Sequence, residues 1–77
     1  MTIRTPDYLR IVNGITEQIR SGELTPGDKL PTYSQLAEHY KVGLSTAQAA
    51  LRVLRERGFI ESHPGKGTYV AENPPQA

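Results

Sequence analysis

The chain has 77 residues, a length that allows one small domain with a single hydrophobic core. It contains no cysteine, which excludes a disulfide framework and a thiolate metal site, and no apolar run approaches the roughly 18 residues of a membrane span. The N-terminus also lacks the apolar core of a signal peptide. These features predict a cytoplasmic protein without a membrane partner.

The formal net charge of +1 is unevenly distributed along the chain. Residues 1–40 sum to −1, whereas residues 41–70 sum to +3. The cations of the second segment are Lys41, Arg52, Arg55, Arg57 and Lys66. A local positive excess is the electrostatic footprint of a nucleic-acid contact, although a solvated helix face gives a similar pattern.

The first predicted element is an amphipathic helix over about residues 8–20. The apolar positions that recur at helical spacing are Tyr8, Ile11, Val12, Ile15 and Ile19. Asp7 is expected to cap the start of this helix, and Gly22 lies just beyond its end. Residues 1–7 are then an N-terminal arm.

A reversal of the chain follows at Thr25-Pro26-Gly27-Asp28, where proline and glycine hold the central positions of a type II turn. Lys29-Leu30 is expected to form a brief strand. The second helix is predicted over residues 33–40, because Thr32 and Gln35 fit a capping box. Its apolar side consists of Leu36, Ala37 and Tyr40.

The third helix is predicted over about residues 44–57, after a tight connector at Lys41-Val42-Gly43. Its apolar stripe is Ala47, Ala50, Leu51 and Leu54, and Gly58 supplies its stop. Two helices joined by a short glycine-containing turn form a helix-turn-helix unit.

Two strands are predicted at about residues 59–62 and 68–71, joined by a loop at residues 63–67. The expected fold is therefore mainly α with a small β-hairpin: a winged helix-turn-helix with three helices and a two-stranded wing, over residues 8–71. The expected core joins Val12, Ile15, Ile19, Leu36, Leu51, Leu54 and Val70.

Residues 72–77 are polar and proline-rich, as in a linker or frayed tail.

Opposite its apolar stripe, the start of the third helix presents Leu44, Ser45, Thr46, Gln48, Ala49 and Arg52. In a helix-turn-helix these positions reach base edges and phosphates of DNA. Gln48 can bond adenine in a bidentate manner, and Leu44 or Ala49 can touch a thymine methyl group. Ser45 and Thr46 can serve base or phosphate, or they can merely start the helix through a capping box that ends at Gln48.

Further candidates for DNA contact flank this helix. Thr32 and Ser34 lie at the start of the second helix, where free N–H groups attract phosphate. Lys66 stands between Gly65 and Gly67, which permit the chain to approach the DNA backbone or minor groove closely. A hairpin turn that only faces solvent has the same composition.

Other side chains point to no further chemistry. Tyr33 and Tyr40 are expected to pack rather than to stack on nucleic acid. His39 and His63 are too few and too far apart for a metal site, and no set of nucleophile, base and metal ligands is present. We therefore expect neither a cofactor nor an enzymatic activity.

Several spaced motifs, taken together, resemble the DNA-binding domain of GntR-family bacterial transcriptional regulators. The motifs are Ser21-Gly22-Glu23-Leu24, Pro26-Gly27-Asp28-Lys29-Leu30-Pro31, Leu36-Ala37, Ala50-Leu51, Leu54, Gly58-Phe59-Ile60 and Gly65-Lys66-Gly67-Thr68-Tyr69-Val70. The resemblance implies binding to double-stranded DNA and transcriptional control, typically repression. It also implies a C-terminal effector domain that forms the dimer, so a chain of this length corresponds either to an N-terminal fragment or to a naturally short regulator.

This sequence departs from the family pattern at positions that matter for DNA recognition. Family members commonly carry arginines where this chain has Ser34, Leu44 and Gln48, and a serine where it has Gly43. The departures imply a different target sequence. They also keep open a second hypothesis, a winged-helix module that binds protein rather than DNA. The isolated domain is expected to be monomeric or weakly dimeric, with pairing on an operator.

Overall fold

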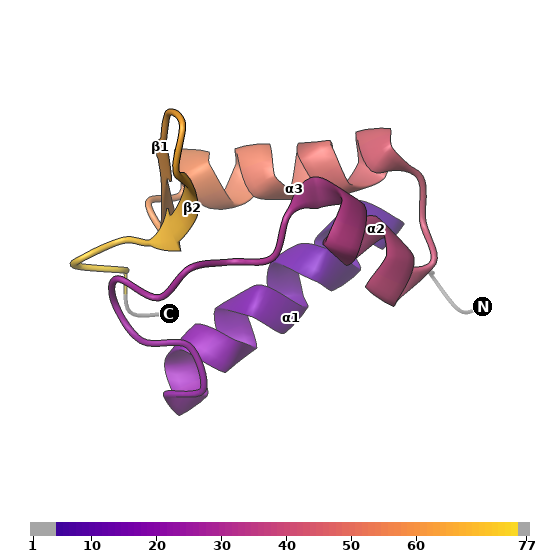
Figure 1. The fold of residues 1–77 in the computed structure, drawn as a ribbon. Coiled ribbons are helices and arrows are strands. Elements are labelled where there is room, and N and C mark those ends of the chain that lie inside the picture. The colour runs from indigo at the N-terminus through magenta and orange to yellow at the C-terminus, as the bar shows by residue number, and fades with distance from the viewer. Residues whose placement is uncertain (1–4, 76–77) are drawn as a thin grey trace.

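A computed structural model describes residues 5–75, so residues 1–4 of the expected arm and 76–77 of the expected tail lie outside the described residues. Its elements in chain order are α1 (Asp7–Ser21), α2 (Tyr33–Tyr40), α3 (Leu44–Glu56), β1 (Ile60–His63) and β2 (Gly67–Val70). The three predicted helices and the two-stranded hairpin are confirmed, and every boundary lies within one residue of its predicted place. Figure 1 shows α1 and α2 on the same side of α3, with the hairpin at the C-terminal end of α3.

The start of α1 differs from the expectation. Asp7 is not the cap but the first helical residue, and the capping position is held by Pro6, which makes no side-chain cap bond. The Asp7 carboxylate instead accepts a hydrogen bond from Arg10 Nη1 at 3.1 Å. A negative charge in the first turn remains favourable there because it faces the positive end of the helix dipole. Gly22 ends α1 as predicted, with φ 86°.

The second helix begins with the predicted capping box. The Thr32 side chain accepts from the amide N–H of Gln35 at 3.2 Å, and the Gln35 side chain accepts from the amide N–H of Thr32 at 2.9 Å. The short connector to α3 then turns through Lys41, which has φ 58°. This turn brings α2 and α3 into contact as a helix-turn-helix unit.

The core joins all three helices to the hairpin. Six of the seven predicted core residues are buried, whereas Ile19 is only half-buried, because its position in the last turns of α1 borders an open hollow. The other large buried side chains are Ile11, Leu30, Phe59 and Ile60. Leu54 is fully buried, which stabilises the fold by about 1.5–3 kcal/mol for a side chain of that size.

The hairpin is widened at its base by the segment that precedes α2. β1 and β2 pair in antiparallel fashion, with Ile60 opposite Val70. The predicted turn forms, with Asp28 N–H donating to the Thr25 carbonyl at 3.0 Å and Gly27 at φ 89°. The expected brief strand is an isolated bridge in which Lys29 pairs with Tyr69 of β2. This bridge ties the base of the wing to the start of α2.

No helix within residues 5–75 is long and apolar enough to span a bilayer. After β2 the chain continues without helix or strand through residues 72–75. Pro75 nevertheless lies beside Gly58, since a β-carbon at that glycine would be 3.6 Å from the Pro75 Cγ. This end of the described chain therefore contacts the turn between α3 and β1.

Candidate nucleic-acid interface

The third helix carries apolar and polar side chains on opposite faces. The inward face consists of the buried residues Ala47, Ala50, Leu51 and Leu54. On the outward face Gln48 is exposed, as predicted, and so are Ser45 and Arg52. Leu44, the first residue of α3, is 53% exposed, whereas Thr46 and Ala49 are half-buried at the edges of this face. The first two turns of α3 thus present a mixed polar and apolar surface.

The start of α3 shows whether Ser45 caps this helix, an alternative that the sequence left open. Gly43 occupies the capping position, and its carbonyl accepts from the amide N–H groups of Thr46 at 3.1 Å and Ala47 at 3.2 Å. The helix therefore starts before Ser45, and a capping box from Ser45 to Gln48 does not form. The Ser45 hydroxyl is consequently not used as the cap of α3.

The start of α2 presents three consecutive exposed residues, Thr32, Tyr33 and Ser34. The Thr32 hydroxyl is already engaged in the capping box, while Ser34 lies one residue further on the surface. The prediction that Tyr33 packs was wrong: its side chain is 41% exposed. Tyr40, at the other end of α2, is half-buried and packs against the core as predicted.

The wing ends in a tight turn with a cation at its tip. Lys66 is exposed, and its amide N–H donates to the His63 carbonyl at 2.9 Å. Gly65 has φ 77°, a left-handed conformation that a β-carbon would strain. Gly67, in contrast, is half-buried and begins β2 rather than lying at the tip. Of the three residues predicted to contact DNA at the wing, Gly65 and Lys66 therefore lie in the exposed turn, and Gly67 lies at the start of the strand.

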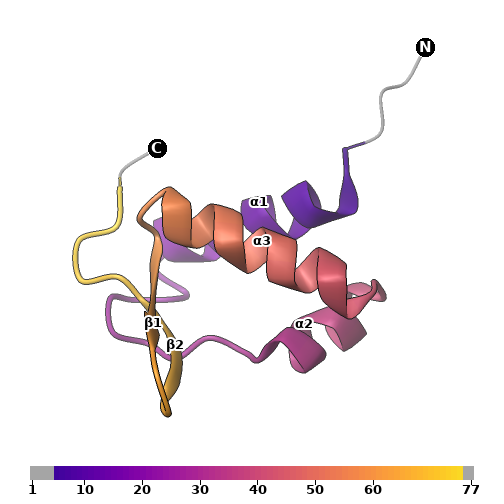
Figure 2. The same ribbon diagram turned by 90° about the horizontal axis from the view of Figure 1, so that it is seen from above.

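The structure brings only some of the predicted residues together: Thr32, Gly65 and Gly67 line one hollow, whereas Leu44, Gln48 and Arg52 of α3 do not line it. Figure 2 shows the wing at the C-terminal end of α3, and residues 30–32 running from beside β2 to the start of α2. A hollow of about 310 Å³ lies between the wing and this segment. Residues from the wing, from residues 29–33 and Leu51 of α3 line it.

Two cations among the predicted DNA contacts are not neutralised by ion pairs. Within residues 5–75 the ion pairs are Arg10 with Asp7 and Arg20 with Glu17, and His63 lies 3.5 Å from Glu61, a contact that is an ion pair only when His63 is protonated. Lys66 and Arg52 belong to none of these pairs. Their charges are therefore available to an anionic partner.

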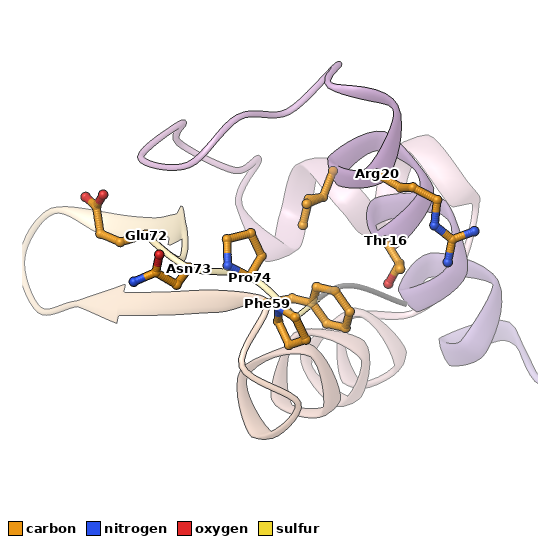
Figure 3. Close-up of a pocket in the computed structure, with 8 residues that line it drawn as sticks. Thr16, Arg20, Phe59, Glu72, Asn73 and Pro74 are labelled. Atoms are coloured by element: carbon orange, nitrogen blue, oxygen red, sulfur yellow. The ribbon is translucent and has the colours of Figure 1, made fainter.

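A second hollow, of about 480 Å³, lies between α1 and residues 72–75. Figure 3 shows Thr16, Arg20 and Phe59 facing it together with the chain segment that follows the wing. None of the residues predicted to contact DNA lines this hollow. Within the described part of the chain, no three His, Asp or Glu side chains are grouped so as to hold a metal ion.

Comparison with solved structures places this fold among DNA-binding regulators. A transcriptional regulator from Oenococcus oeni superposes with a TM-score of 0.89 and 30% sequence identity, over 95% of this chain and 61% of that one. The DNA-binding domain of AraR, solved in complex with operator ORR3, superposes with a TM-score of 0.87 and 30% identity, over 92% of this chain and 86% of that one.

Sequence comparison agrees with this placement. The chain is 49% identical over 67 residues to the mannosyl-D-glycerate transport/metabolism system repressor of Escherichia coli (strain K12), which covers 87% of this chain. The matched segment spans only 28% of the length of that repressor. The model of the bacterial regulatory proteins of the gntR family matches residues 7–70, from the first residue of α1 to the last of β2. The chain therefore belongs to the GntR family of bacterial regulatory proteins.

Proposed function

We propose that this chain binds double-stranded DNA in a sequence-dependent manner and regulates transcription in the bacterial cytoplasm, most simply by repression. The observation that carries the proposal is the outward face of α3, where Leu44 and Gln48 are exposed while Leu51 and Leu54 of the same helix are buried. In a helix-turn-helix that face enters the major groove. The exposed Lys66 of the wing would then contact the adjacent backbone or minor groove.

The proposed roles of the α3 side chains follow from their chemistry. Gln48 would donate to N7 of adenine and accept from its N6 amino group, and Leu44 would contact a thymine methyl group. Ser45 and Thr46 would serve a base edge or a phosphate, and Arg52 a phosphate further along the groove. Because the resemblance to the GntR family implies arginines where this chain has Leu44 and Gln48, the preferred bases should shift from guanine toward adenine and thymine.

Two further groups would fix the position of α3 in the groove without specifying sequence. Ser34 lies at the exposed start of α2, where backbone N–H groups favour a phosphate, and Thr32 holds that start in place through its capping box. At the wing, Gly65 would allow the turn to approach the DNA backbone, and Gly67 would support the strand behind it. These contacts would set the orientation of the domain on the duplex.

Relatives support this function and suggest its context. AraR was solved on an operator, and the E. coli relative is named as a repressor. Since this chain matches only part of that longer repressor, pairing on DNA would come from two half-sites or from a further domain that binds an effector.

Selection from random duplex DNA, followed by a salt titration on the selected fragment, tests the proposal. If each copy neutralises about three to five phosphates, log K should fall with log salt at a slope of roughly −3 to −4. Enrichment of one motif with such a slope is the expected result. The absence of salt-dependent binding to any duplex would overturn the proposal and favour the module that binds protein, for which the exposed Tyr33 and Leu44 would form the contact surface.

A further inference from the structure

The hollow between the wing and the start of α2 has two walls of different origin. One wall consists of Pro31, Thr32 and Tyr33, and the other of residues 62–65 of the hairpin. Lys29 lines the hollow beside β2. The walls thus belong to the two elements that flank α3 in the proposed DNA interface (Figure 2).

The position of Lys29 is fixed by contacts with β2. Its backbone forms the bridge to Tyr69, and the neighbouring Leu30 N–H donates to the Thr68 carbonyl at 2.8 Å. Its side chain lies along Gly67: a β-carbon at that glycine would be 3.0 Å from the Lys29 Cε and 3.7 Å from its Nζ. Gly67 also has φ 131°, a conformation that favours glycine. The absence of a side chain at Gly67 therefore leaves room for the Lys29 stem.

The ammonium group of Lys29 forms no ion pair with Asp28, its neighbour in the sequence, or with Glu61, which lies opposite Tyr69 in the hairpin. Asp28 precedes it, but the Asp28 carboxylate accepts from the Thr25 N–H at 2.8 Å and from the Thr25 hydroxyl at 3.0 Å. The Glu61 carboxylate lies 3.5 Å from His63 Nε2 in the wing. No aspartate or glutamate is among the residues that line the hollow, and Lys29 takes part in none of the ion pairs within residues 5–75.

We infer that this cleft receives one sugar-phosphate strand of duplex DNA and that Lys29 contacts a phosphate within it. The inference rests on the proposed DNA binding, to which it adds a residue that the sequence did not single out. A backbone strand that leaves the groove occupied by α3 and reaches the wing would pass beside Leu51 of α3, between the wing and the start of α2. The cleft lies at that place and carries an unpaired positive charge, which matches a phosphate.

Lys29→Gln tests the inference by removing one charge from the cleft. We expect weaker binding to all sequences alike, since a phosphate contact carries no sequence information. The magnitude of the salt slope should fall by roughly 0.9, so the ratio of unaltered to variant affinity should shrink about 3.5-fold between about 50 and about 200 mM salt. Fluorescence anisotropy of the 77-residue chain on a mixed-sequence duplex measures both quantities.

Arg55→Gln is the matched control, because it removes the same charge from an exposed position in the last turn of α3, away from the cleft. Its salt slope should equal that of the unaltered chain. Equal changes of the salt slope in both variants would mean that only the net charge of the chain matters. An unchanged salt slope in Lys29→Gln would mean that Lys29 contacts no phosphate. Either result overturns the inference while leaving DNA binding intact. If the unaltered chain bound no duplex at all, the proposed function would fail as well.

Gly67→Ala tests the positioning of Lys29. The added methyl group would displace the Lys29 stem, so Lys29→Gln should cost much less affinity in the Gly67→Ala background than in the unaltered chain. Circular dichroism melting shows whether the wing change also lowers folding stability, and binding is compared only at temperatures where all four proteins are folded. Fully additive losses would overturn the role assigned to Gly67.

Discussion

The hydroxyl group of Tyr40, at the end of α2, occupies the space that a β-carbon would need at Gly14 in the middle of α1. Alanine at an ordinary helix interior position stabilises a fold by about 0.5–1 kcal/mol relative to glycine. At Gly14 this gain is opposed by overpacking, which typically costs about 1–3 kcal/mol. The glycine therefore allows the close approach of Tyr40 to α1.

Gly14→Ala should lower the free energy of unfolding by roughly 1 kcal/mol, because the overpacking cost exceeds the gain in helix propensity. In a Tyr40→Phe background, Gly14→Ala should instead raise the free energy of unfolding by up to about 1 kcal/mol. Without the hydroxyl group, the nearest atom to the new β-carbon is the ring Cζ at position 40, at an ordinary contact distance of 3.5 Å. Urea unfolding of the four proteins, followed by circular dichroism, measures this reversal of sign. Stabilisation by Gly14→Ala in both backgrounds would show that Tyr40 moves aside at little cost.

Asp28 gives the fold a pH-dependent contribution. The backbone N–H of Thr25, and after it the Thr25 hydroxyl, hold the pKa of the Asp28 carboxyl below its usual value of 3.8. Since the pKa is lower in the folded than in the unfolded chain, the charged form stabilises the fold above the unfolded value. That contribution is lost as the pH falls through the folded pKa.

Asp28→Asn should therefore lower the urea midpoint of unfolding near neutral pH. The difference in midpoint from the unaltered chain should become smaller as the pH falls below about 4. Glu38→Gln, at an exposed position of α2, controls for the loss of one negative charge. The measurement is the midpoint of each variant across that pH range. A difference between Asp28→Asn and the unaltered chain that stayed constant down to acid pH would contradict the assigned hydrogen bonds.

Local signals account for what the sequence predicted correctly. The capping box of Thr32 and Gln35, the turn at Gly27 and the stop at Gly22 each depend on residues within four positions of one another. The inward and outward faces of α3 follow from periodicity alone. These signals were sufficient for the fold and for the placement of Gln48 on the surface.

The errors arise where the outcome depends on neighbours that are distant in sequence or on exact helix geometry. Lys29 reaches the cleft between the wing and the start of α2 only because the segment before α2 pairs with β2, about 40 residues later in the chain. Tyr33 is exposed because no element covers the first turn of α2 on the side of the wing, where the cleft lies. Asp7 fails as a cap because the helix begins one residue earlier than its spacing indicated.

The isolated chain should be monomeric at micromolar concentration without DNA. Among residues 5–75 the large apolar side chains that are exposed are Tyr33 and Leu44, one at the start of each helix of the proposed DNA interface. Two such side chains form too small a patch to hold a stable dimer. Sedimentation velocity measures the mass, and a tight dimer in the absence of DNA would refute this expectation.

Lys66→Ala should weaken binding to many DNA sequences by a similar factor, because a lysine at the tip of a wing contacts mainly backbone. The magnitude of the salt slope should fall by roughly 0.9 for the loss of one phosphate contact, while the ratio of affinities between two unrelated duplexes stays the same. Anisotropy titrations on both duplexes measure slope and ratio together. If affinity and slope were both unchanged, the wing would have to be removed from the interface.

Gln48 decides whether the outward face of α3 reads sequence. Its exposed side chain lies one turn into the helix, opposite Ala47, Ala50 and Leu51. Gln48→Ala should cost roughly 1–3 kcal/mol of binding free energy on the selected site and should relax the preference at one base pair, where adenine is expected. Binding to unrelated duplex should hardly change, because no charge is lost.

Gln48→Arg sharpens this test, because arginine forks onto O6 and N7 of guanine. The preferred base at the same position should then change from adenine to guanine, and binding to all sequences should strengthen through the added charge. Titration of the unaltered chain and both variants against the selected site and its single-base changes measures these shifts. Equal losses for Gln48→Ala on every single-base variant would mean that Gln48 only positions α3, and no loss on any of them would mean that α3 does not enter the major groove by this face.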